Sequence, residues 1–252
     1  MVQSKVKQPL PSGAELPDSD DMPADNEDQN LLPNILLFVL NFIWADHPKC
    51  FFAVDMGGYH TANNQPRVPI VPDAFLSMGV DRYKGDTFRR SYVVWEEEDI
   101  VPTMAMELVS WSPGGEYDRK METYRKLGIL YYVIYNPNYW QRDRHQPFEV
   151  YKLIDGDYKL QIGEPYWMPE AGIGIGRAQS KVGGEQREIL SWFESDGTRI
   201  LTMEERAEKF ENEAQKFQGE VQKFQGEAQK FQSKAEKLAA RLRELGEDPD
   251  SI

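Results

Sequence analysis

The sequence predicts an α/β domain of the α+β kind, with a mixed sheet flanked by helices, followed by one long C-terminal helix. Two observations carry this prediction. Between residues 26 and 200, apolar segments follow the order helix, several strands, helix, strand and hairpin. From residue 201 to 246, apolar residues recur every seven positions, as in a coiled coil. We therefore expect an extended acidic, Pro-rich arm (1–25), the α/β domain (26–200), the coiled-coil helix (201–246) and a tail (247–252).

The first half of the domain reads as one helix and then strands. A helix is expected over residues 26–47, with Asp25 or Asn26 as its cap. Strands are expected within residues 50–60 and 67–78, and a strand, a turn and another strand within 91–110. In this scheme Asp55 is a strand-end residue beside a double glycine, and the acidic run Glu96–Asp99 is a solvated turn.

The second half contains a helix that ends at Gly128, a continuous apolar strand over residues 129–135, and a hairpin over 147–161. The Asp155–Gly156 pair is the turn that such a hairpin favours. The stretch GIGIGR, residues 172–177, lacks the strand and helix that a dinucleotide-binding fingerprint needs, so we interpret it as a glycine-rich turn.

The C-terminal region holds a heptad pattern for six repeats, about 63 Å of helix. The d positions are Phe210, Phe217, Phe224, Phe231, Leu238 and Leu245, and the a positions are Ala207, Ala214, Val221, Ala228, Ala235 and Leu242. Such a narrow, regular stripe favours self-association, most simply as a homodimer. A single helix folded back on the domain is the alternative, and the number and direction of the strands stay open.

Composition limits the classes of protein. The chain has 252 residues, a net charge of −13, one cysteine and three histidines. A single cysteine allows no internal disulfide and fits a reducing cytoplasm, which is the predicted location. The most apolar run, residues 31–45, is shorter than a bilayer requires, and the first residues do not resemble a secretory signal, so no membrane association is expected. The acidic balance gives weak electrostatic steering toward nucleic acid.

Two carboxylates stand out because they lie in strand contexts. Asp73 lies in IVPDAF and Glu107 in AMELVS. Carboxylates from neighbouring strands are the ligands that Mg²⁺ (or Mn²⁺) prefers, and the Leu108 carbonyl could add a third oxygen. Lys120 opens the following predicted helix and could reach the carboxylates, where its ammonium would stabilise a phosphate or help to activate water. Tyr124 shares its helix face.

The strings VPDAFLS and MELVSWSPGGEYDRKMETYRKLGILYYVIYNP resemble the Uma-type restriction endonuclease family of the PD-(D/E)xK nuclease superfamily, which is common in cyanobacteria. The similarity covers roughly residues 25–176. The resemblance implies a restriction-endonuclease-like core, in which a helix precedes a curved sheet with a metal site at its edge. It also implies DNA as substrate and a divalent cation as cofactor.

Residue by residue, the resemblance makes Asp73 the motif aspartate and Glu107 the motif glutamate. The superfamily usually has lysine two positions after this glutamate, whereas this chain has Val109. The family often carries a lysine in the following helix instead, and Lys120 fits that place. Glu27 in the first helix matches the additional acidic residue that many members contribute to the metal.

Structural interpretations compete with each of these roles. Glu107 could pair with an arginine or accept backbone amides, and Asp73 could belong to a turn after Pro72. Lys120 could be a surface residue opposite Glu116, while Glu27 could complement the helix dipole. Two functions follow: a Mg²⁺-dependent endonuclease that uses Asp73, Glu107 and Lys120, or a catalytically degenerate nuclease fold that serves as an assembly module through its coiled coil. The recognition sequence and the choice between DNA and RNA stay open.

Overall fold

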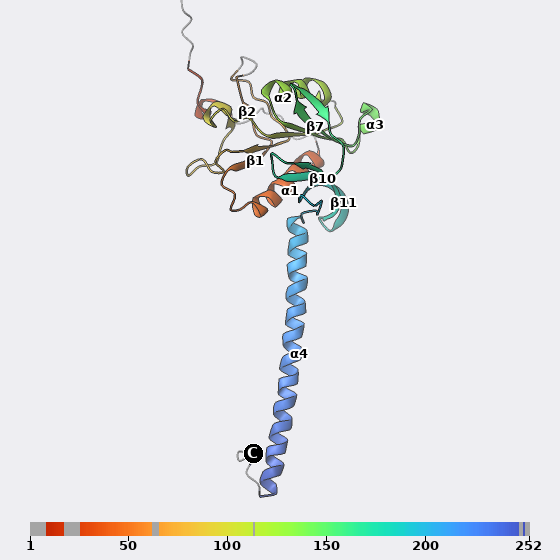
Figure 1. Ribbon diagram of the computed structural model, residues 1–252. Helices are drawn as coiled ribbons and strands as arrows, with labels where there is room; N and C mark the ends of the chain where they lie inside the picture. Colours follow the sequence, from red (N-terminus) through yellow and green to blue (C-terminus); the bar gives the residue numbers. More distant parts are fainter. Residues whose placement is uncertain (1–8, 18–25, 62–65, 113, 247–248, 250–252) are drawn as a thin grey trace, which may run out of the picture. The chain divides into compact units, whose positions relative to one another are not determined.

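The computed structural model describes residues 9–17, 26–61, 66–112, 114–246 and 249 (Figure 1). The chain divides into two compact units, Met1–Met203 and Glu204–Ile252. Among the described residues, none of the helices combines the length and the apolar character that crossing a bilayer requires. The predicted class, a mixed α+β domain with a long C-terminal helix, is confirmed.

A six-stranded sheet forms the centre of the first unit. Its strands lie in the order β1-β3-β5-β6-β7-β8, with β5 and β6 parallel and the other neighbouring pairs antiparallel. The strands are β1 (Cys50–Val54), β3 (Ala74–Met78), β5 (Met104–Leu108), β6 (Tyr131–Tyr135), β7 (Phe148–Ile154) and β8 (Asp157–Leu160). Asp155 and Gly156 join β7 to β8 with positive φ angles of 52° and 83°, which confirms the predicted hairpin turn.

Helix α1 (Glu27–Ile43) covers one face of this sheet, together with a smaller sheet (Figure 1). The smaller sheet has the order β11-β10-β9. Its strands are β9 (Tyr166–Met168), β10 (Ile173–Val182) and β11 (Glu185–Phe193). Met106 of β5 packs into the shared core, and the Trp192 indole N–H donates to the Leu36 carbonyl at 2.9 Å. The α1 cap is Asn26, whose side chain accepts from the Gln29 N–H; Asp25 lies outside the described residues.

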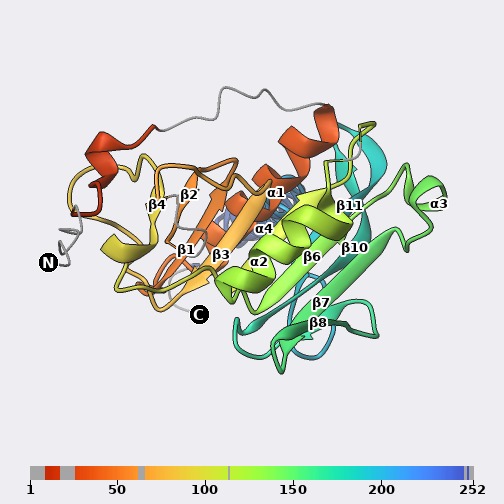
Figure 2. The ribbon, with the colours of Figure 1, turned by 90° about the horizontal axis from the view of Figure 1, so that it is seen from above.

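The other face carries one turn of π-helix, η3 (Glu116–Lys120), which continues into α2 (Met121–Leu127) (Figure 2). The helix ends at Gly128, where φ is 80°, as the sequence predicts. Successive side chains of a strand point to opposite faces. Ala105 and Val109 therefore pack toward Tyr124 of α2, and Glu107, between them, points to the same face.

The prediction for GIGIGR is wrong for Ile173–Arg177, which begin strand β10, while Gly172, with a φ of 68°, lies in the turn before the strand. Gly176 is required by packing: a Cβ added there would lie 2.9 Å from Pro165 Cα. A Cβ on Gly174 would lie 3.2 Å from Phe193 Cβ. The glycines thus allow β10 to approach its neighbours closely, which is a common use of glycine within a strand.

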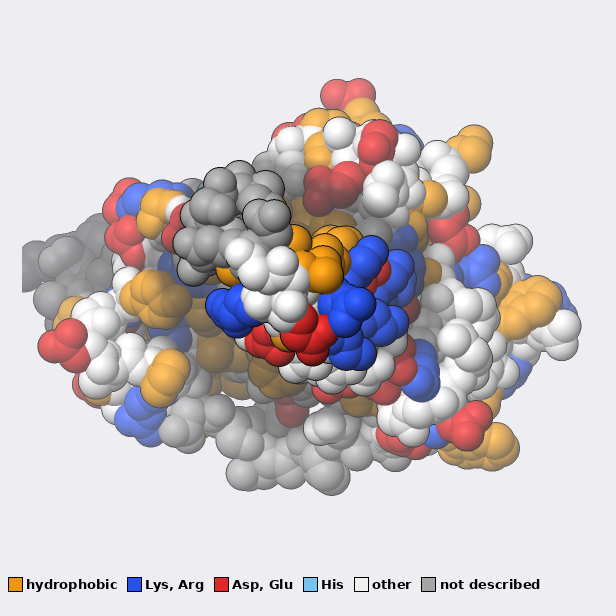
Figure 3. All heavy atoms as spheres, turned by 90° about the horizontal axis from the view of Figure 1, so that it is seen from below, with side chains coloured by type: hydrophobic (Ala, Val, Ile, Leu, Met, Phe, Trp, Pro, Cys, Tyr) orange, Lys and Arg blue, Asp and Glu red, His pale blue; other side chains and the backbone are white. Residues whose placement is uncertain are grey.

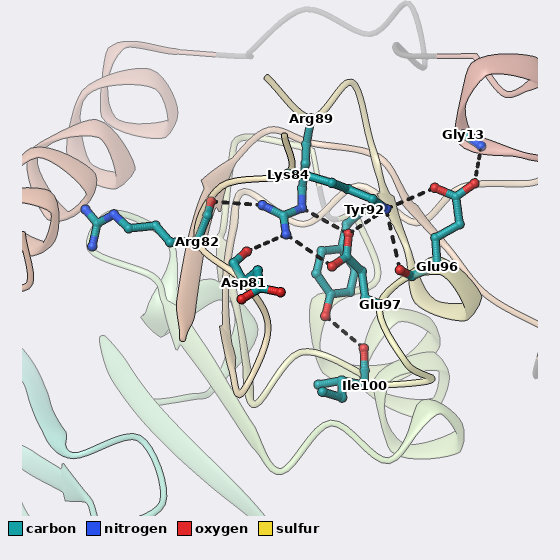
Figure 4. A network of polar contacts seen from close by, with 9 residues as sticks. All are labelled: Gly13, Asp81, Arg82, Lys84, Arg89, Tyr92, Glu96, Glu97 and Ile100. Atoms are coloured by element: carbon teal, nitrogen blue, oxygen red, sulfur yellow. Dashed lines mark hydrogen bonds and ion pairs between the residues drawn. The ribbon is translucent and has the colours of Figure 1, made fainter. Parts of the chain in front are cut away.

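The predicted solvated turn at Glu96–Asp99 is also wrong in part. Glu97 is buried, and its carboxylate accepts from the buried Arg89 guanidinium at 3.0 Å and from Lys84 Nζ at 3.1 Å (Figure 4). Burying this charge is tolerable because it is paired and hydrogen-bonded. The strand predicted over residues 67–78 is shorter than expected, since β3 begins at Ala74.

Part of the predicted N-terminal arm is packed. Within residues 9–17, η1 (Gly13–Glu15) places the Gly13 N–H 2.7 Å from Glu96 Oε1 (Figure 4). The Trp95 indole N–H donates to the Pro11 carbonyl, and the Tyr59 hydroxyl donates to the Pro17 carbonyl. The remaining short elements are β2 (Gly58–Tyr59), β4 (Tyr92–Val93), η2 (Val94–Glu96) and α3 (Trp140–Asp143).

The second unit consists mainly of α4 (Met203–Glu244), a helix of 42 residues. No residue of this helix is buried within the described part of the chain. Figure 3 shows hydrophobic, basic and acidic side chains next to one another on the face of the molecule that it draws. The helix lies within the range 201–246 expected for the coiled coil, and its pairing with another helix stays a prediction.

Candidate active site

Glu107 is a carboxylate buried within strand β5, and its charge is compensated by neighbouring side chains. Its side chain is 0% exposed and receives two hydrogen bonds from the η3–α2 segment. Lys120 Nζ lies 2.7 Å from Glu107 Oε2, and the buried Tyr124 hydroxyl donates to Oε1. Lys120 and Tyr124 are one helical turn apart, so one segment supplies both donors. The interpretation of Lys120 as a surface residue paired with Glu116 does not describe this contact.

Asp73 lies directly before β3, beside the end of β5. Ala74 pairs with Met106 in the antiparallel ladder, so the next step of this register puts Asp73 opposite Glu107. Side chains directly opposite each other in such a pair lie on the same face of the sheet. Asp73 Oδ2 accepts the Leu108 backbone N–H at 2.5 Å. The structure therefore brings Asp73, Glu107 and Lys120 into one cluster.

The cluster raises the pKa of both carboxyl groups. Burial raises the pKa of Glu107 to about 8, and the nearby Asp73 charge acts in the same direction, against the opposing effect of Lys120. Burial raises the pKa of Asp73 to about 6, although the Leu108 N–H and Lys120 favour its charged form. Both shifts have the same consequence: burial and mutual repulsion disfavour the state in which Asp73 and Glu107 are both charged.

Lys120 keeps its charge in this environment. Burial alone would lower the pKa of its ammonium, but Glu107, Asp73 and Glu116 outweigh burial, so the pKa is raised. The Lys120 side chain is 30% exposed, which leaves one side of the ammonium accessible from solvent. A protonated amine next to two carboxylates can therefore neutralise added negative charge at this point.

The donor set fits a hard divalent cation. Asp73 and Glu107 supply carboxylate oxygens, and relief of their mutual repulsion would favour a bound cation. Within the residues that the structure describes, no group of three or more His, Cys, Asp or Glu side chains could hold a metal ion. Further ligands would have to be carbonyl, water or phosphate oxygens. The predicted third donor, the Leu108 carbonyl, accepts from Gln29 Nε2 at 3.2 Å.

Glu27, the fourth predicted ligand, has another contact. It is the first residue of α1, is exposed, and places Oε1 3.2 Å from Arg187 Nη1. The α1 residue that reaches the strand end is Gln29, two positions further on, through its bond to the Leu108 carbonyl. The sequence offered a weak signal for Gln29, namely its place in the first turns of a helix expected to precede the site.

Asp55 also lies near the cluster. It follows β1 with a φ of 48°, its N–H donates to the Asp73 carbonyl at 3.2 Å, and its charge adds to the raised pKa of Asp73. Its interpretation as a plain strand-end residue was therefore incomplete. Tyr124 was expected to share a face with Lys120, but its direct bond to Glu107 depends on how α2 packs on the sheet.

Val109 lies two positions after Glu107, where the sequence resemblance leads to the expectation of a lysine. It is 4% exposed and packs with Tyr124, Ile129 and Ile134. An ammonium at this place would lie in an apolar cluster and be costly to bury. The positive charge beside Glu107 comes instead from Lys120, on the segment that covers the same face.

The fold and this cluster define a mixed α+β domain with two neighbouring carboxylates and a lysine where β3 begins and β5 ends. The family model described as "Uma2: Putative restriction endonuclease" matches residues 21–177. The match spans more than half of the chain, so the chain belongs to this family, which supports a nuclease-like function. A comparison with curated proteins gave no match.

A solved structure is also similar to this chain. It is described as "a putative nuclease belonging to DUF820" from Anabaena variabilis. The sequence identity is 12% and the TM-score is 0.41, and the similarity covers 58% of this chain and 74% of the other.

Proposed function

We propose that this protein is a Mg²⁺- or Mn²⁺-dependent endonuclease that hydrolyses phosphodiester bonds of DNA. The observation that supports this proposal most is the contact of buried Glu107 with Lys120, at a strand end where Asp73 lies opposite. Two carboxylates can hold a divalent cation that activates water, and a charged amine can stabilise the negative charge that develops on a phosphate. Membership of the Uma2 family supports the same class of reaction.

In this proposal Asp73 and Glu107 hold the cation, with the Leu108 carbonyl as a further oxygen donor. When bound, the cation would lower the pKa of a water molecule and neutralise charge on a phosphate. The Leu108 N–H fixes the Asp73 carboxylate, and Tyr124 orients Glu107. The Lys120 ammonium lies where it can stabilise the negative charge that develops on the phosphate.

Val109 supports a second candidate function, in which the domain has lost catalysis and serves assembly through α4. Its apolar side chain replaces the lysine that the superfamily usually places two residues after the glutamate. Under this alternative Glu107 and Lys120 form a structural ion pair. We also propose that α4 joins two copies of the chain, which is compatible with either function.

Titration of Mn²⁺ or Mg²⁺ into the wild type and Asp73→Ala, followed by incubation with single- and double-stranded DNA, separates the two candidates. The endonuclease proposal predicts metal-dependent cleavage by the wild type and none by Asp73→Ala. The matched control is Asp157→Ala, which removes an exposed carboxylate of β8 and should cleave like the wild type. If none of the three proteins cleaves DNA at any concentration of Mn²⁺ or Mg²⁺, the result would support the assembly module.

A further inference from the structure

The d positions of α4 form a stripe of large apolar side chains in water. Phe210, Phe217, Phe224 and Phe231 are 61%, 68%, 70% and 71% exposed. Between them lie small residues, mostly alanine, at the a positions. Exposed aromatic side chains in a continuous row mark an interaction surface. Their regular heptad spacing fits another helix with the same spacing, and a second copy of this chain supplies one.

The sizes of the a and d side chains decide how two such helices can run. In a parallel pair, a faces a and d faces d, so layers of two alanines would alternate with layers of two phenylalanines. A single helix separation cannot close-pack both kinds of layer. In an antiparallel pair, each a position faces a d position of the partner, so every layer combines a different pair of side chains, mostly one small and one large.

One antiparallel register aligns all six layers. Ala228 meets the partner's Phe224 near the centre, and the remaining layers follow at intervals of seven residues. The six contacts, each repeated by the two-fold axis, are Ala207 with the partner's Leu245, Ala214 with Leu238, Val221 with Phe231, Ala228 with Phe224, Ala235 with Phe217, and Leu242 with Phe210. The bulkiest of these layers, Leu242 with Phe210, lies near the ends of the overlap, where the helices can separate most easily.

The charged flanks favour the same direction. The g positions are Glu213, Glu220 and Glu227 in the first part of the stripe and then Lys234 and Arg241. In the antiparallel register, g faces g, so Glu213 meets the partner's Arg241 and Glu220 meets the partner's Lys234. The two-fold axis repeats both contacts, which gives four attractive pairs. Glu227 meets its own copy at the axis and is the one repulsive pair.

A parallel pair would form fewer ion pairs between the flanking positions of the two helices. There each g position faces the e position five residues further along the partner. Glu213, Glu220 and Glu227 would then face glutamines, and Arg206 with the partner's Glu211 would be the ion pair among these contacts. In the single chain, Arg241 bonds Glu244 at the helix surface, with both side chains well exposed, so this contact can exchange for an intermolecular one.

From these layers and charges we propose that two copies of this chain form a two-stranded antiparallel coiled coil through α4. The proposal goes beyond the proposed nuclease activity and does not depend on it. In such a pair the N-terminal ends of the two α4 helices lie about 60 Å apart along the coiled coil, from the rise of 1.5 Å per residue.

Disulfide trapping in the full chain tests the direction of the helices. Ala214→Cys and Leu238→Cys are made singly, and the two variants are then mixed under mild oxidation. An antiparallel pair gives a covalent dimer in the mixture and little in either variant alone, because position 214 faces position 238 of the partner. The wild type, whose single Cys50 is buried, is the control and should stay uncrosslinked. Crosslinking of each variant with itself would overturn the antiparallel direction.

A charge reversal provides an independent test by sedimentation of the full chain. Glu220→Lys would face the partner's Lys234, and the dimer dissociation constant should rise about tenfold. Glu220→Lys combined with Lys234→Glu restores the pair and should return the dissociation constant to the wild-type value. In a parallel pair, Glu220→Lys faces Gln225, so an unchanged dissociation constant would contradict the proposal. A wild-type chain that sediments as a monomer or a tetramer would overturn it.

Discussion

Glu107 is fully buried and still titratable, so its ionisation couples the stability of the protein to pH. An unfolded glutamate has a pKa of about 4.3, whereas the folded protein raises the pKa of Glu107 to about 8. Between these values the folded state holds a proton that the unfolded state has released. The free energy of unfolding therefore falls as pH rises from about 4.5 to 8. Asp73, with its pKa raised to about 6, acts in the same direction.

Glu107→Gln should remove much of the fall in unfolding free energy that occurs as pH rises. We expect the metal-free variant to gain on the order of 2–4 kcal/mol relative to the wild type between pH 5 and 8, because the amide cannot ionise. Denaturant unfolding of both proteins with EDTA, at several pH values, measures the difference. If the wild type is the more stable protein at pH 8, Glu107 serves chiefly as an ion-pair partner of Lys120.

The affinity for a divalent cation should rise with pH, whereas the stability of the metal-free protein should fall. A cation that binds Glu107 must displace the proton held near neutral pH, so affinity rises as pH rises. Release of one proton predicts about a tenfold lower Kd for Mn²⁺ per pH unit between pH 6 and 8. Calorimetric titration of the wild type measures this slope. A pH-independent Kd would show that Mn²⁺ binds away from Glu107.

The close packing of β10 against residue 165 should contribute to the stability of the fold. Gly176→Ala would place a Cβ 2.9 Å from the Pro165 backbone, so the variant should lose about 1–3 kcal/mol of unfolding free energy. Gln179→Ala on an exposed position of the same strand is the control and should change stability by less than about 0.5 kcal/mol. Equal stability of the two variants would mean that β10 does not approach residue 165 so closely.

Elements with a strong local signal were predictable from the sequence. The apolar run at 129–135, the Asp155–Gly156 hairpin and the helix that ends at Gly128 each have their own periodicity or turn chemistry. The smaller sheet was not predicted, because Gly174 and Gly176 look like turn residues until the neighbouring chain that excludes a side chain is known. The buried Glu97 was missed for a similar reason, since its partner Arg89 is set by tertiary packing.

The part of the candidate site that strand alternation and the order of the motifs define could be predicted from the sequence. Strand alternation put Glu107 and Val109 on one face, and the helix after them supplied Lys120. The contacts of Gln29 with Leu108 and of Asp55 with Asp73 join segments far apart in sequence. No periodicity within one segment indicates such contacts, so they required the fold.

Because the chain divides into two compact units, we expect the first unit to fold without the second. A chain that ends at Met203 should keep the fold of the first unit, because its core is made by the sheets, α1 and α2. We expect its melting temperature to lie within about 2 °C of that of the first unit in the full chain, and the shortened chain to sediment as a monomer. A dimeric shortened chain would place the main association surface outside α4.

If Glu107 belongs to a metal-dependent hydrolytic site, single-turnover cleavage of duplex DNA with Mn²⁺ must depend on its carboxylate. The rate is compared for the wild type, Glu107→Gln and Glu122→Gln, a change of an exposed carboxylate on the same helical segment as Lys120. We expect Glu107→Gln to cleave at least about 10²-fold more slowly than the wild type, and Glu122→Gln to stay within about twofold of it. Cleavage by Glu107→Gln at the wild-type rate, or no Mn²⁺-dependent cleavage by the wild type, would contradict this role of Glu107.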